Sequence, residues 1–313
     1  MKISVVIPLL NESPNLRPLY DEISQVFEPL PHDYEIIFID DGSTDDSLDV
    51  LKVLHNEDSH VVVVEFRRNF GQTAGLAAGF DYATGDIIIT MDADRQNDPA
   101  DIPQLLEKIE EGYDLVCGWR FDRQDTFVSR KLPSMLANKL ISKTTDVRLH
   151  DYGCTLKAMR AEVAKNITLY GELHRFIPAI ASWMGVKIAE VKVNHRPRTM
   201  GTSKYGISRT FRVILDLITV KFLLDYSGRP IHFFGLPGLA FGTIGFLIAL
   251  VMTVQKMFGV SMGDRPLLLL AIFLMMAGLQ LIVFGLLAEL QIRTYHESQK
   301  KPIYVVKQIH AND

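Results

Sequence analysis

Short apolar runs alternate with amphipathic stretches along the first part of the chain. The runs are rich in β-branched residues and predict strands at residues 3–8, 35–39, 61–66, 87–91 and 115–116. Between them, apolar residues at helical spacing predict helices at residues 15–27, 45–55, 73–83 and 99–111, the last with Asp98 as N-cap and Pro99 in its first turn. Because the runs are continuously apolar, we expect an α/β fold with a doubly wound, mostly parallel sheet that binds ligands at the carboxyl ends of its strands.

Two long apolar stretches follow, at residues 233–254 and 267–288. The first has no charged residue, and Gln280 is the one strongly polar side chain of the second. Each is long enough to cross a hydrocarbon core of about 30 Å, so the pattern predicts two transmembrane helices joined by a loop at residues 255–266. Basic residues are more frequent before the first stretch and after the second than in the loop. This distribution predicts an inner (plasma) membrane protein whose N-terminal domain and termini are cytoplasmic.

The segments beside these stretches have patterns of their own. Residues 208–226 are amphipathic at helical spacing and fit either a core helix or a helix in the membrane interface, and their place before the first span favours the interface. Residues 303–309 have strand propensity and can pair with a sheet edge in the same or a neighbouring subunit. We therefore expect an N-terminal domain (1–206), a juxtamembrane segment (207–230), two transmembrane helices (231–290) and a cytoplasmic tail (291–313).

Composition narrows the classes of function. The 313 residues carry a net charge of −4 and are 48% hydrophobic, with a mean hydropathy of +0.12. This mild acidity argues against nucleic-acid binding, which normally uses a strongly basic face. Cys117 and Cys154 are the two cysteines, and we expect both to be reduced thiols. The residues before the first predicted strand do not have the pattern of a secretory signal.

Carboxylates follow two of the predicted strands. The run DDGSTD at residues 40–45 can accept hydrogen bonds from a ribose or a base, although a helix cap followed by a turn explains it as well. Asp92 and Asp94 stand one residue apart after the fourth strand, where each raises the pKa of the other unless a cation intervenes. A divalent ion relieves this repulsion and also binds a diphosphate, whereas the plainer interpretation is a solvated acidic turn. Two acidic turns at strand ends of one α/β chain favour the ligand site.

Five motifs resemble those of the inverting glycosyltransferases of family 2, which have the GT-A (Rossmann-like) fold. They are PLLNE at residues 8–12, DDGSTD at 40–45, RRNFGQTAG at 67–75, MDADRQND at 91–98 and GWR at 118–120. Within that family the chain is similar to the polyprenyl-phosphate glycosyltransferases, and its two apolar stretches match the bacterial undecaprenyl-phosphate glucosyltransferases in layout. The resemblance implies transfer of one sugar, with glucose from UDP-glucose as the expected donor, to undecaprenyl or another polyprenyl phosphate at the cytoplasmic face of the membrane.

The resemblance also implies the site residues. Donor-binding positions are expected at Pro8, Asn11, Glu12, Asp40, Asp41, Gly71, Gln72 and Asp92. A metal ion, Mg²⁺ or Mn²⁺, is expected at Asp92, Asp94 and Gln96. The residues expected to contact the reacting phosphates or to take part in catalysis are Asp94, Arg120, Arg130, Ser134, Asp151, Arg198 and Lys204.

An anionic acceptor would explain the many basic candidates. A phosphomonoester has a second pKa of about 6, so it is largely anionic at neutral pH and needs no strong general base. Arginine forks such as those of Arg120 and Arg130 suit the binding and aiming of an anion that attacks next to a diphosphate. Asp151 is interpreted either as a base or as a residue that orders Arg or Lys side chains.

Alternative interpretations differ in substrate or in class. Mannose, N-acetylglucosamine or aminoarabinose donors and a diacylglycerol-type acceptor are alternatives among enzymes, and a scaffold or lipid carrier without catalysis is the alternative outside them. Intact Asp92 and Asp94 argue against the scaffold. The sequence lacks the Q-x-x-R-W motif of processive polysaccharide synthases, a Gly-rich phosphate loop and histidines at metal-ligand spacing.

Small residues in the first apolar stretch predict close helix packing. Gly238 and Gly242 form a G-x-x-x-G pair of the kind that lets helix backbones approach. Together with the resemblance to the glucosyltransferases, this pair predicts a homo-tetramer, with residues 303–309 as a candidate strand between subunits.

Overall fold

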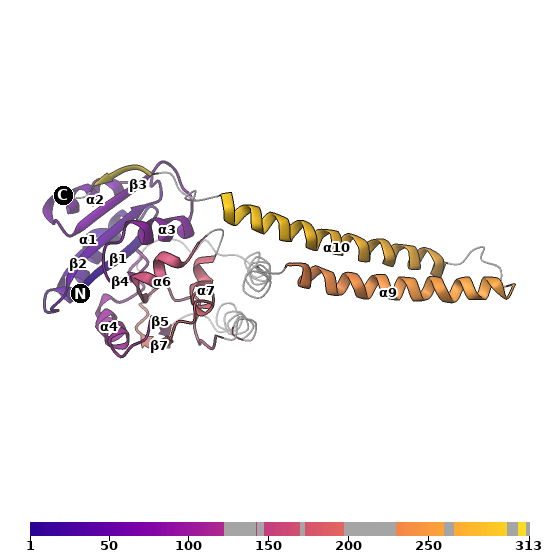
Figure 1. Ribbon diagram of the computed structural model, residues 1–313. Helices are drawn as coiled ribbons and strands as arrows, with labels where there is room; N and C mark the ends of the chain where they lie inside the picture. Colours follow the sequence, from indigo (N-terminus) through magenta and orange to yellow (C-terminus); the bar gives the residue numbers. More distant parts are fainter. Residues whose placement is uncertain are drawn as a thin grey trace. The chain divides into compact units, whose positions relative to one another are not determined.

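The computed structural model describes residues 1–121, 142, 147–169, 173–196, 230–259, 266–298 and 306–310. The chain divides into two compact units. One holds Met1–Leu217 together with Pro302–Asp313, and the other holds Ile218–Lys301. The first contains a β-sheet with helices on both faces, and the second contains two long helices (Figure 1).

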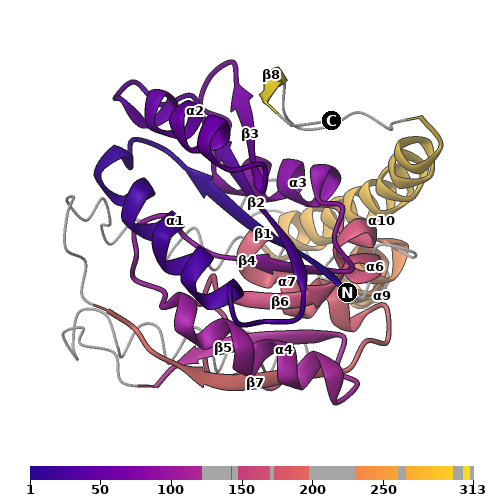
Figure 2. The same cartoon turned by 90° about the vertical axis from the view of Figure 1, so that its left-hand side faces the viewer.

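A mixed sheet forms the centre of the first unit (Figure 2). Its strands are β1 (Lys2–Leu9), β2 (Asp33–Asp40), β3 (Val61–Phe66), β4 (Ile87–Thr90), β5 (Leu115–Arg120), β6 (Lys157–Arg160), β7 (Ile188–Val193) and β8 (Val306–His310). They lie in the order β7-β5-β6-β4-β1-β2-β3-β8. β6 and β8 pair antiparallel to their neighbours, and the other pairings are parallel. The predicted α/β fold with a mostly parallel sheet is confirmed.

The apolar runs explain why β1 and β2 lie at the centre of the sheet. Consecutive residues of a strand point to opposite faces, yet Val5 and Val6 in β1 and Ile36 and Ile37 in β2 are all fully buried. Both faces must therefore be covered. β1 and β2 pair in parallel from Lys2↔Asp33 to Leu9↔Asp40, so their carboxyl ends are level.

Helices cover the two faces in two groups. α1 (Ser13–Phe27), α2 (Ser47–Glu57) and α4 (Ile102–Glu110) pack with the apolar core on one face (Figure 2). α3 (Gln72–Tyr82), α6 (Ala161–Asn166), α7 (Ile177–Ser182) and the short 3-10 helix η3 (Leu173–Phe176) lie on the other face. A further 3-10 turn, η1 (Pro99–Asp101), leads into α4, and the side chain of Asp98 accepts a hydrogen bond from Ala100 N at 3.0 Å. The predicted cap at Asp98 is confirmed.

α3 approaches β1 closely because it carries glycines on its inner side. A Cβ built on Gly79 would lie 2.1 Å from a methyl group of Val6, and one on Gly75 would lie 2.7 Å from Cβ of Pro8. Distances this short leave no room for a side chain at either position. The glycines therefore let the amino end of α3 lie directly over the carboxyl end of β1.

β6 is the main element that the apolar pattern does not reveal. It inserts antiparallel between β4 and β5 and pairs with both of them, with Ala158 opposite Ile89 and Val116. Its four residues begin and end with a charged residue, and Lys157 is only 3% exposed. A short strand of this composition resembles a loop in sequence, because its place in the sheet comes from its neighbours.

The tail returns to the sheet of the first unit. β8 pairs antiparallel with β3, with Ile309 opposite Val64 and Gln308 opposite Glu65. The strand propensity expected at residues 303–309 is therefore confirmed at Val306–His310, and the strand pairs within its own chain. The pairing also covers the edge of β3, which would otherwise expose unpaired backbone groups.

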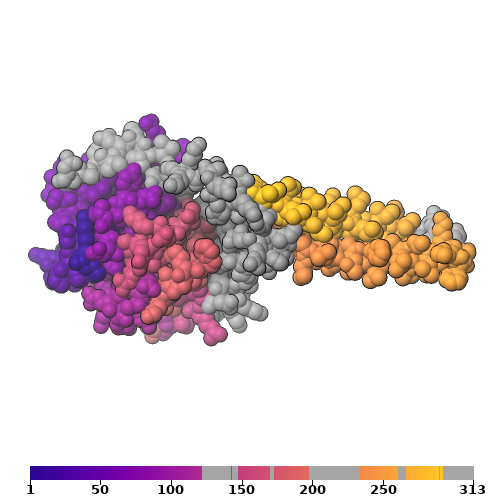
Figure 3. All heavy atoms as spheres, in the orientation of Figure 1, coloured from indigo at the N-terminus to yellow at the C-terminus, as the bar shows by residue number. Residues whose placement is uncertain are grey.

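The second unit is a helical hairpin of α9 (Pro230–Met257) and α10 (Pro266–Ser298), which lie side by side (Figure 3). Within them, Phe233–Met257 and Pro266–Ala288 are long and apolar enough to cross a membrane, and 11% of each apolar window is buried. Large apolar side chains such as Leu236 (75% exposed) and Phe273 (67%) face outward. A lipid environment would cover this surface, so the finding supports the predicted spans.

Glycines bring the two helices of the hairpin together. A Cβ on Gly278 would lie 2.5 Å from the carbonyl oxygen of Gly238, and one on Gly245 would lie 2.7 Å from that of Ala271. Gly238, Gly245 and Gly278 thus serve packing within the chain, whereas a Cβ on Gly242 would meet nothing within 4 Å, and packing between subunits stays a prediction. The amphipathic segment at residues 208–226 lies outside the described residues.

Candidate functional site

The predicted donor residues gather where β1, β2 and β4 end. β1 lies between β2 and β4, so the chain order reverses beside it. In α/β sheets such a switch point forms a crevice at the carboxyl ends of the strands. The loops after β1, β2 and β4 carry Asn11 and Glu12, Asp40 and Asp41, and Asp92 to Gln96 respectively.

Asn11 ties the loop after β1 to the loop after β2. Its backbone is in the left-handed region, with φ of 57°. Its side-chain oxygen accepts a hydrogen bond from Thr44 N at 2.8 Å, and its own N–H donates to Ser43 Oγ at 2.9 Å. Glu12 accepts from Asn15 Nδ2 at 2.7 Å, and its N–H donates to Ser47 Oγ. The side-chain oxygen of Asn11 therefore shapes the turn at DDGSTD, whatever it contributes to a ligand.

Asp40 and Asp41 are both buried at the end of β2. Asp40 Oδ1 accepts from Ser43 N at 3.1 Å, whereas the two oxygens of Asp41 accept from Phe70 N at 2.6 Å and Gly71 N at 2.8 Å. Burial raises the pKa of each carboxyl group, although these hydrogen bonds oppose the change. Asp41 thus holds the Arg67–Gly71 loop, which turns at Gly71 with φ of 94° into α3.

The side chain of Asp92 is held by neighbours from two other parts of the chain. Gln72 Nε2, at the start of α3, donates to Asp92 Oδ1 at 2.8 Å. Thr155 Oγ1, just before β6, lies 2.8 Å from Asp92 Oδ2 and 2.9 Å from Asn97 Oδ1. Removal from water raises the pKa of Asp92 to about 6, and repulsion from Asp94 adds to this effect. An added cation would relieve both.

Asp94 and Gln96 lie on the turn that follows. Asp94 is 8% exposed, and its Oδ1 accepts from Gln96 N at 3.1 Å. Arg95, between them, has a left-handed φ of 59°. In the described residues no group of three or more His, Cys, Asp and Glu side chains is placed to hold a metal ion. The residues present suit a hard cation that takes two carboxylates from the protein and its other oxygen ligands from an amide, a diphosphate or water.

Arg120 and Asp151 form a buried fork at the carboxyl end of β5. Arg120 Nε donates to Asp151 Oδ2 at 2.6 Å, and Nη2 donates to Oδ1 at 2.9 Å. The side chains are 16% and 5% exposed. Burial opposes the charge of Arg120, but the hydrogen bonds and charge of Asp151 outweigh it and raise the pKa of the guanidinium. Gly153 N also donates to Asp151, so this carboxylate is fully engaged in ordering Arg120 and its loop.

The structure places most of the predicted residues together and leaves some outside its description. Donor and metal candidates lie on the loops already named, and Pro8 is buried beneath α3. The other predicted residues, Arg130, Ser134, Arg198 and Lys204, lie outside the described residues.

Several residues near the site were not predicted from the sequence. Thr155 contacts Asp92, and the buried Lys157 donates to the carbonyl of Cys154. The positive charges of Lys157 and Arg120 also act to lower the pKa of Asp92, because they stabilise its ionised form. Both residues belong to the run DYGCTLKAMR at residues 151–160, but the run does not identify either residue without the antiparallel position of β6.

The thiols lie in the same region and are unreactive. Cys117 and Cys154 are free and fully buried. Burial raises the pKa of Cys117 to about 12 and that of Cys154 to about 11. Both stay protonated near neutral pH, and the prediction of two reduced thiols is confirmed.

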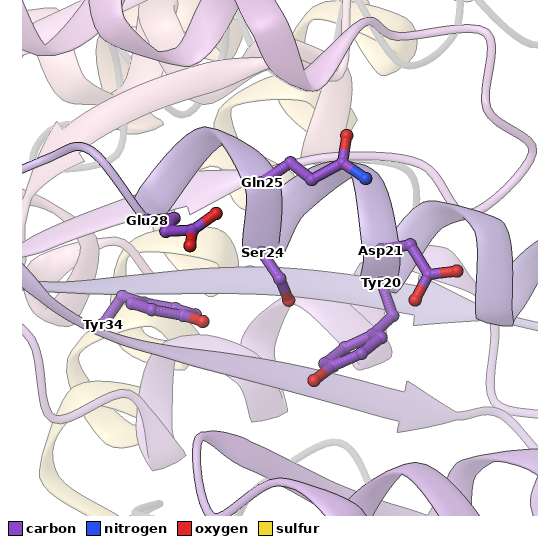
Figure 4. Close-up of a pocket in the computed structure, with 6 residues that line it drawn as sticks. All are labelled: Tyr20, Asp21, Ser24, Gln25, Glu28 and Tyr34. Carbon is purple, nitrogen blue, oxygen red and sulfur yellow. The ribbon is translucent and has the colours of Figure 1, made fainter.

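A separate hollow lies against α1 (Figure 4). It is lined by Tyr20, Asp21, Ser24, Gln25, Glu28 and Tyr34. Tyr34 stands near the start of β2, whereas the donor candidates follow the ends of the strands. The hollow includes none of the predicted site residues.

The family model and the relatives that match this chain all describe proteins that transfer or attach sugars. Residues 4–168 match the model of Glycosyl transferase family 2. A dodecaprenyl-phosphate galacturonate synthase of Rhizobium johnstonii is 45% identical over 314 residues, which cover 99% of this chain and 93% of the relative. An undecaprenyl-phosphate 4-deoxy-4-formamido-L-arabinose transferase of an Enterobacter species is 37% identical over 311 residues, which cover 98% of this chain and 93% of the relative.

Solved structures with the same fold come from more distant proteins. Glucosyl-3-phosphoglycerate synthase of Mycobacterium tuberculosis, in complex with Mn²⁺ and UDP-glucose, matches with a TM-score of 0.57 at 20% identity, over 72% of this chain and 81% of that one. The same enzyme with Mn²⁺, UDP and glucosyl-3-phosphoglycerate matches with a TM-score of 0.55 at 21% identity, over 71% and 79%. At this identity the likeness concerns the fold of the sheet domain.

Proposed function

Because the chain belongs to glycosyl transferase family 2, we propose that it transfers one sugar from a nucleotide to a polyprenyl phosphate at a membrane surface. The observation that carries the proposal is the combination, in one chain, of a carboxylate pair at the switch point of the sheet and two helices with exposed apolar side chains. Relatives that match nearly the whole chain are named for transfer to dodecaprenyl or undecaprenyl phosphate, which supports this acceptor over a diacylglycerol.

The donor site proposed here includes a divalent metal ion. Asp92 and Asp94 would hold it, with Gln96 as a further oxygen ligand, and the ion would offset charge on the diphosphate leaving group. Support comes from the raised pKa of Asp92, since a cation removes the repulsion that contributes to it. The fold neighbours solved with Mn²⁺ and UDP-glucose are consistent with either Mn²⁺ or Mg²⁺.

The acceptor phosphate would attack the anomeric carbon of the sugar. A bond forms between a phosphate oxygen and that carbon while the bond from the carbon to the nucleotide diphosphate breaks, with inversion at the carbon. The acceptor is already anionic, so the protein has mainly to bind and aim it. Arg120 is suited to this task because Asp151 fixes its guanidinium, which favours an ordering role for Asp151 over that of a base.

The sugar is proposed to be galacturonic acid, carried by UDP. The expectation of glucose is not confirmed, because the relatives that match the whole chain are named for galacturonate and for 4-deoxy-4-formamido-L-arabinose. The relative that is named for galacturonate is 45% identical to this chain, and the relatives that are named for the arabinose derivative are 36–37% identical. The second sugar is therefore the main alternative.

For the orientation in the membrane and the assembly of the protein, we propose what the sequence predicts. We place the sheet domain, the start of α9 and the tail in the cytoplasm, on the basis of basic residues that flank the apolar stretches. The pairing of β8 with β3 supports this arrangement, because it requires the chain to return to the side of the domain after α10. A homo-tetramer stays a prediction.

A donor panel tests this function. Purified protein would be incubated with undecaprenyl phosphate, Mn²⁺ and, separately, UDP-galacturonate, UDP-glucose and UDP-4-deoxy-4-formamido-L-arabinose. We expect a lipid product with the mass of a uronic acid, formed faster than any other. A faster reaction with the arabinose donor would favour the alternative, and hydrolysis of every donor without a lipid product would reject the proposed acceptor.

A further inference from the structure

A network of ion pairs joins α1, the loop after β4 and the end of β7. Glu22 on α1 binds Arg95 through Oε1, and its Oε2 accepts from Arg196 Nη1 at 2.6 Å. Arg196 Nη2 also donates to Asp98 Oδ1 at 2.7 Å. The four side chains are between 15% and 37% exposed, so the network is partly shielded from water. One carboxylate thus binds one arginine of the loop after β4 and one arginine of the segment after β7.

Backbone contacts strengthen the same junction. Arg196 N donates to the carbonyl of Gln96 at 2.9 Å, and Asn97 forms an antiparallel bridge with His195. With the ion pair to Asp98, three consecutive residues of the loop are held by the two residues that follow Asn194. Isolated surface ion pairs contribute little, but a shared carboxylate combined with backbone bonds fixes a geometry.

The network acts on the strained point of the loop. Arg95 adopts a left-handed φ of 59°, a conformation that side chains with a Cβ rarely adopt. It stands between Asp94 and Gln96, so its turn determines how these two side chains are presented. Such a conformation persists only where the surroundings hold it. Glu22 binds the guanidinium of the very residue that carries the strain.

The charges of the network favour the ion pairs that the structure shows. Burial disfavours the ionised form of Glu22, but hydrogen bonds from Arg95 and Arg196 outweigh this effect and lower the pKa of Glu22. The carboxylate is therefore ionised at neutral pH and attracts both arginines. Arg196 is engaged with two carboxylates, those of Glu22 and Asp98.

We propose that Glu22 and Arg196 are positioning residues of the donor site, which fix the turn at Arg95 and thereby present Asp94 and Gln96 to the metal and the diphosphate. The inference rests on the metal-dependent donor site of the proposed function. It makes a helix on one face of the sheet part of the machinery that orders the acidic loop.

The test compares Glu22→Gln with a control variant that breaks another ion pair of α1. Gln keeps the size of the side chain and removes its charge. The control is Glu57→Gln, which removes the ion pair between Arg17 on α1 and Glu57 on α2, with an N–O distance of 2.6 Å and 42% and 50% exposure. For full-length protein in detergent, calorimetry would give the affinity for UDP at several Mn²⁺ concentrations, and thermal unfolding would report stability.

We expect Glu22→Gln to raise the Mn²⁺ concentration needed for half-maximal UDP binding by about ten- to a hundredfold, as for other residues that orient metal ligands. Glu57→Gln should leave it unchanged. Arg196→Gln should give a similar shift, and the double variant should lose little more, because both act through one network. Arg196→Lys should restore part of the affinity.

Three outcomes would overturn the inference. The first is a lower unfolding temperature for Glu22→Gln with unchanged Mn²⁺ dependence, which would make the network merely structural. The second is an equal shift in Glu57→Gln, and the third is full additivity in the double variant. If the wild-type protein itself shows no Mn²⁺-dependent UDP binding, it is the proposed donor site that fails.

Discussion

Asp92 and Asp94 are one residue apart in sequence but are held differently. Gln72 and Thr155, from two other parts of the chain, bind the two oxygens of Asp92, whereas Asp94 accepts a hydrogen bond from Gln96 N within its own turn. A metal ion would thus meet one carboxylate fixed by the fold and a second fixed by its loop.

We expect Asp94→Asn to lower the rate of transfer by about a hundredfold or more, since even residues that only orient metal ligands cost ten- to a hundredfold. The melting temperature should stay the same or rise, because a repelling charge is removed from the acidic pair. Transfer assays over a range of Mn²⁺ concentrations, together with thermal unfolding, check this. Wild-type rates in the variant would show that Asp94 does not bind the metal.

Substitution of Asp151 tests whether this residue orders Arg120 or acts as the catalytic base. In Asp151→Asn the amide cannot neutralise Arg120, so we expect a loss of stability of about 1–3 kcal/mol and a slower transfer with nearly normal UDP affinity. The shape of the pH–rate profile should not change, and the effects of Asp151→Asn and Arg120→Lys should not add. If only Asp151→Asn removes the acidic limb of the profile, then Asp151 is the base.

Secondary structure was predictable where one local pattern decides it. Continuous apolar runs located β1 to β5, and the third strand was placed at residues 61–66, where the structure has β3. The helix expected at residues 45–55 begins instead at Ser47, because Asp45 accepts from the N–H groups of Ser47 and Ser13 and completes the turn. The sequence pattern did not predict β6 and β7, because their places in the sheet depend on the neighbouring strands.

For the candidate site, the sequence predicted which loops carry its residues but did not predict the partners of those residues. Motif order indicated which loops meet, and the carboxyl ends of parallel strands placed Asp41 and Asp92 at one edge of the sheet. Partners that come from other elements could not be read from the sequence. Glu22 stands on an ordinary amphipathic helix, and Thr155 precedes a strand that the pattern did not reveal.

Two glycines of the helical hairpin, Gly278 and Gly242, differ in how much room a side chain would have. A Cβ on Gly278 would meet backbone atoms of α9 at 2.5 Å and 2.6 Å, whereas one on Gly242 would meet nothing within 4 Å. We therefore expect Gly278→Ala to force α9 and α10 apart and to lower the unfolding temperature in detergent. Gly242→Ala should have no such effect. Equal effects of the two variants would contradict the described packing, and loss of an oligomer in Gly242→Ala alone would assign that face to a subunit contact.

The order in which the sheet, α9, α10 and β8 follow one another predicts the membrane topology of the chain. β8 returns to the sheet that holds the N-terminal strands, so the loop between α9 and α10 should lie on the opposite side of the membrane. Single substitutions Met262→Cys and Ala311→Cys place reporters in the loop and in the tail. The native thiols are buried, which keeps the background low.

We expect a membrane-impermeant maleimide added to intact spheroplasts to label Met262→Cys and to leave Ala311→Cys unlabelled until the membrane is opened. Unchanged Cys117 and Cys154 serve as the internal control. Labelling of the tail from outside would reverse the proposed orientation, and labelling of both positions from one side would contradict two spans.

In the proposed reaction, a phosphate on a polyprenyl lipid receives the sugar. The most direct measurement is mass spectrometry of the lipid products that the purified protein makes from UDP-galacturonate and Mn²⁺ with three acceptors: undecaprenyl phosphate, undecaprenol and diacylglycerol. We predict one product, undecaprenyl phosphate with a single uronic acid attached through the phosphate, with equimolar release of UDP and no product from the two alcohols. A glycosylated diacylglycerol or undecaprenol, with undecaprenyl phosphate left unchanged, would contradict the account.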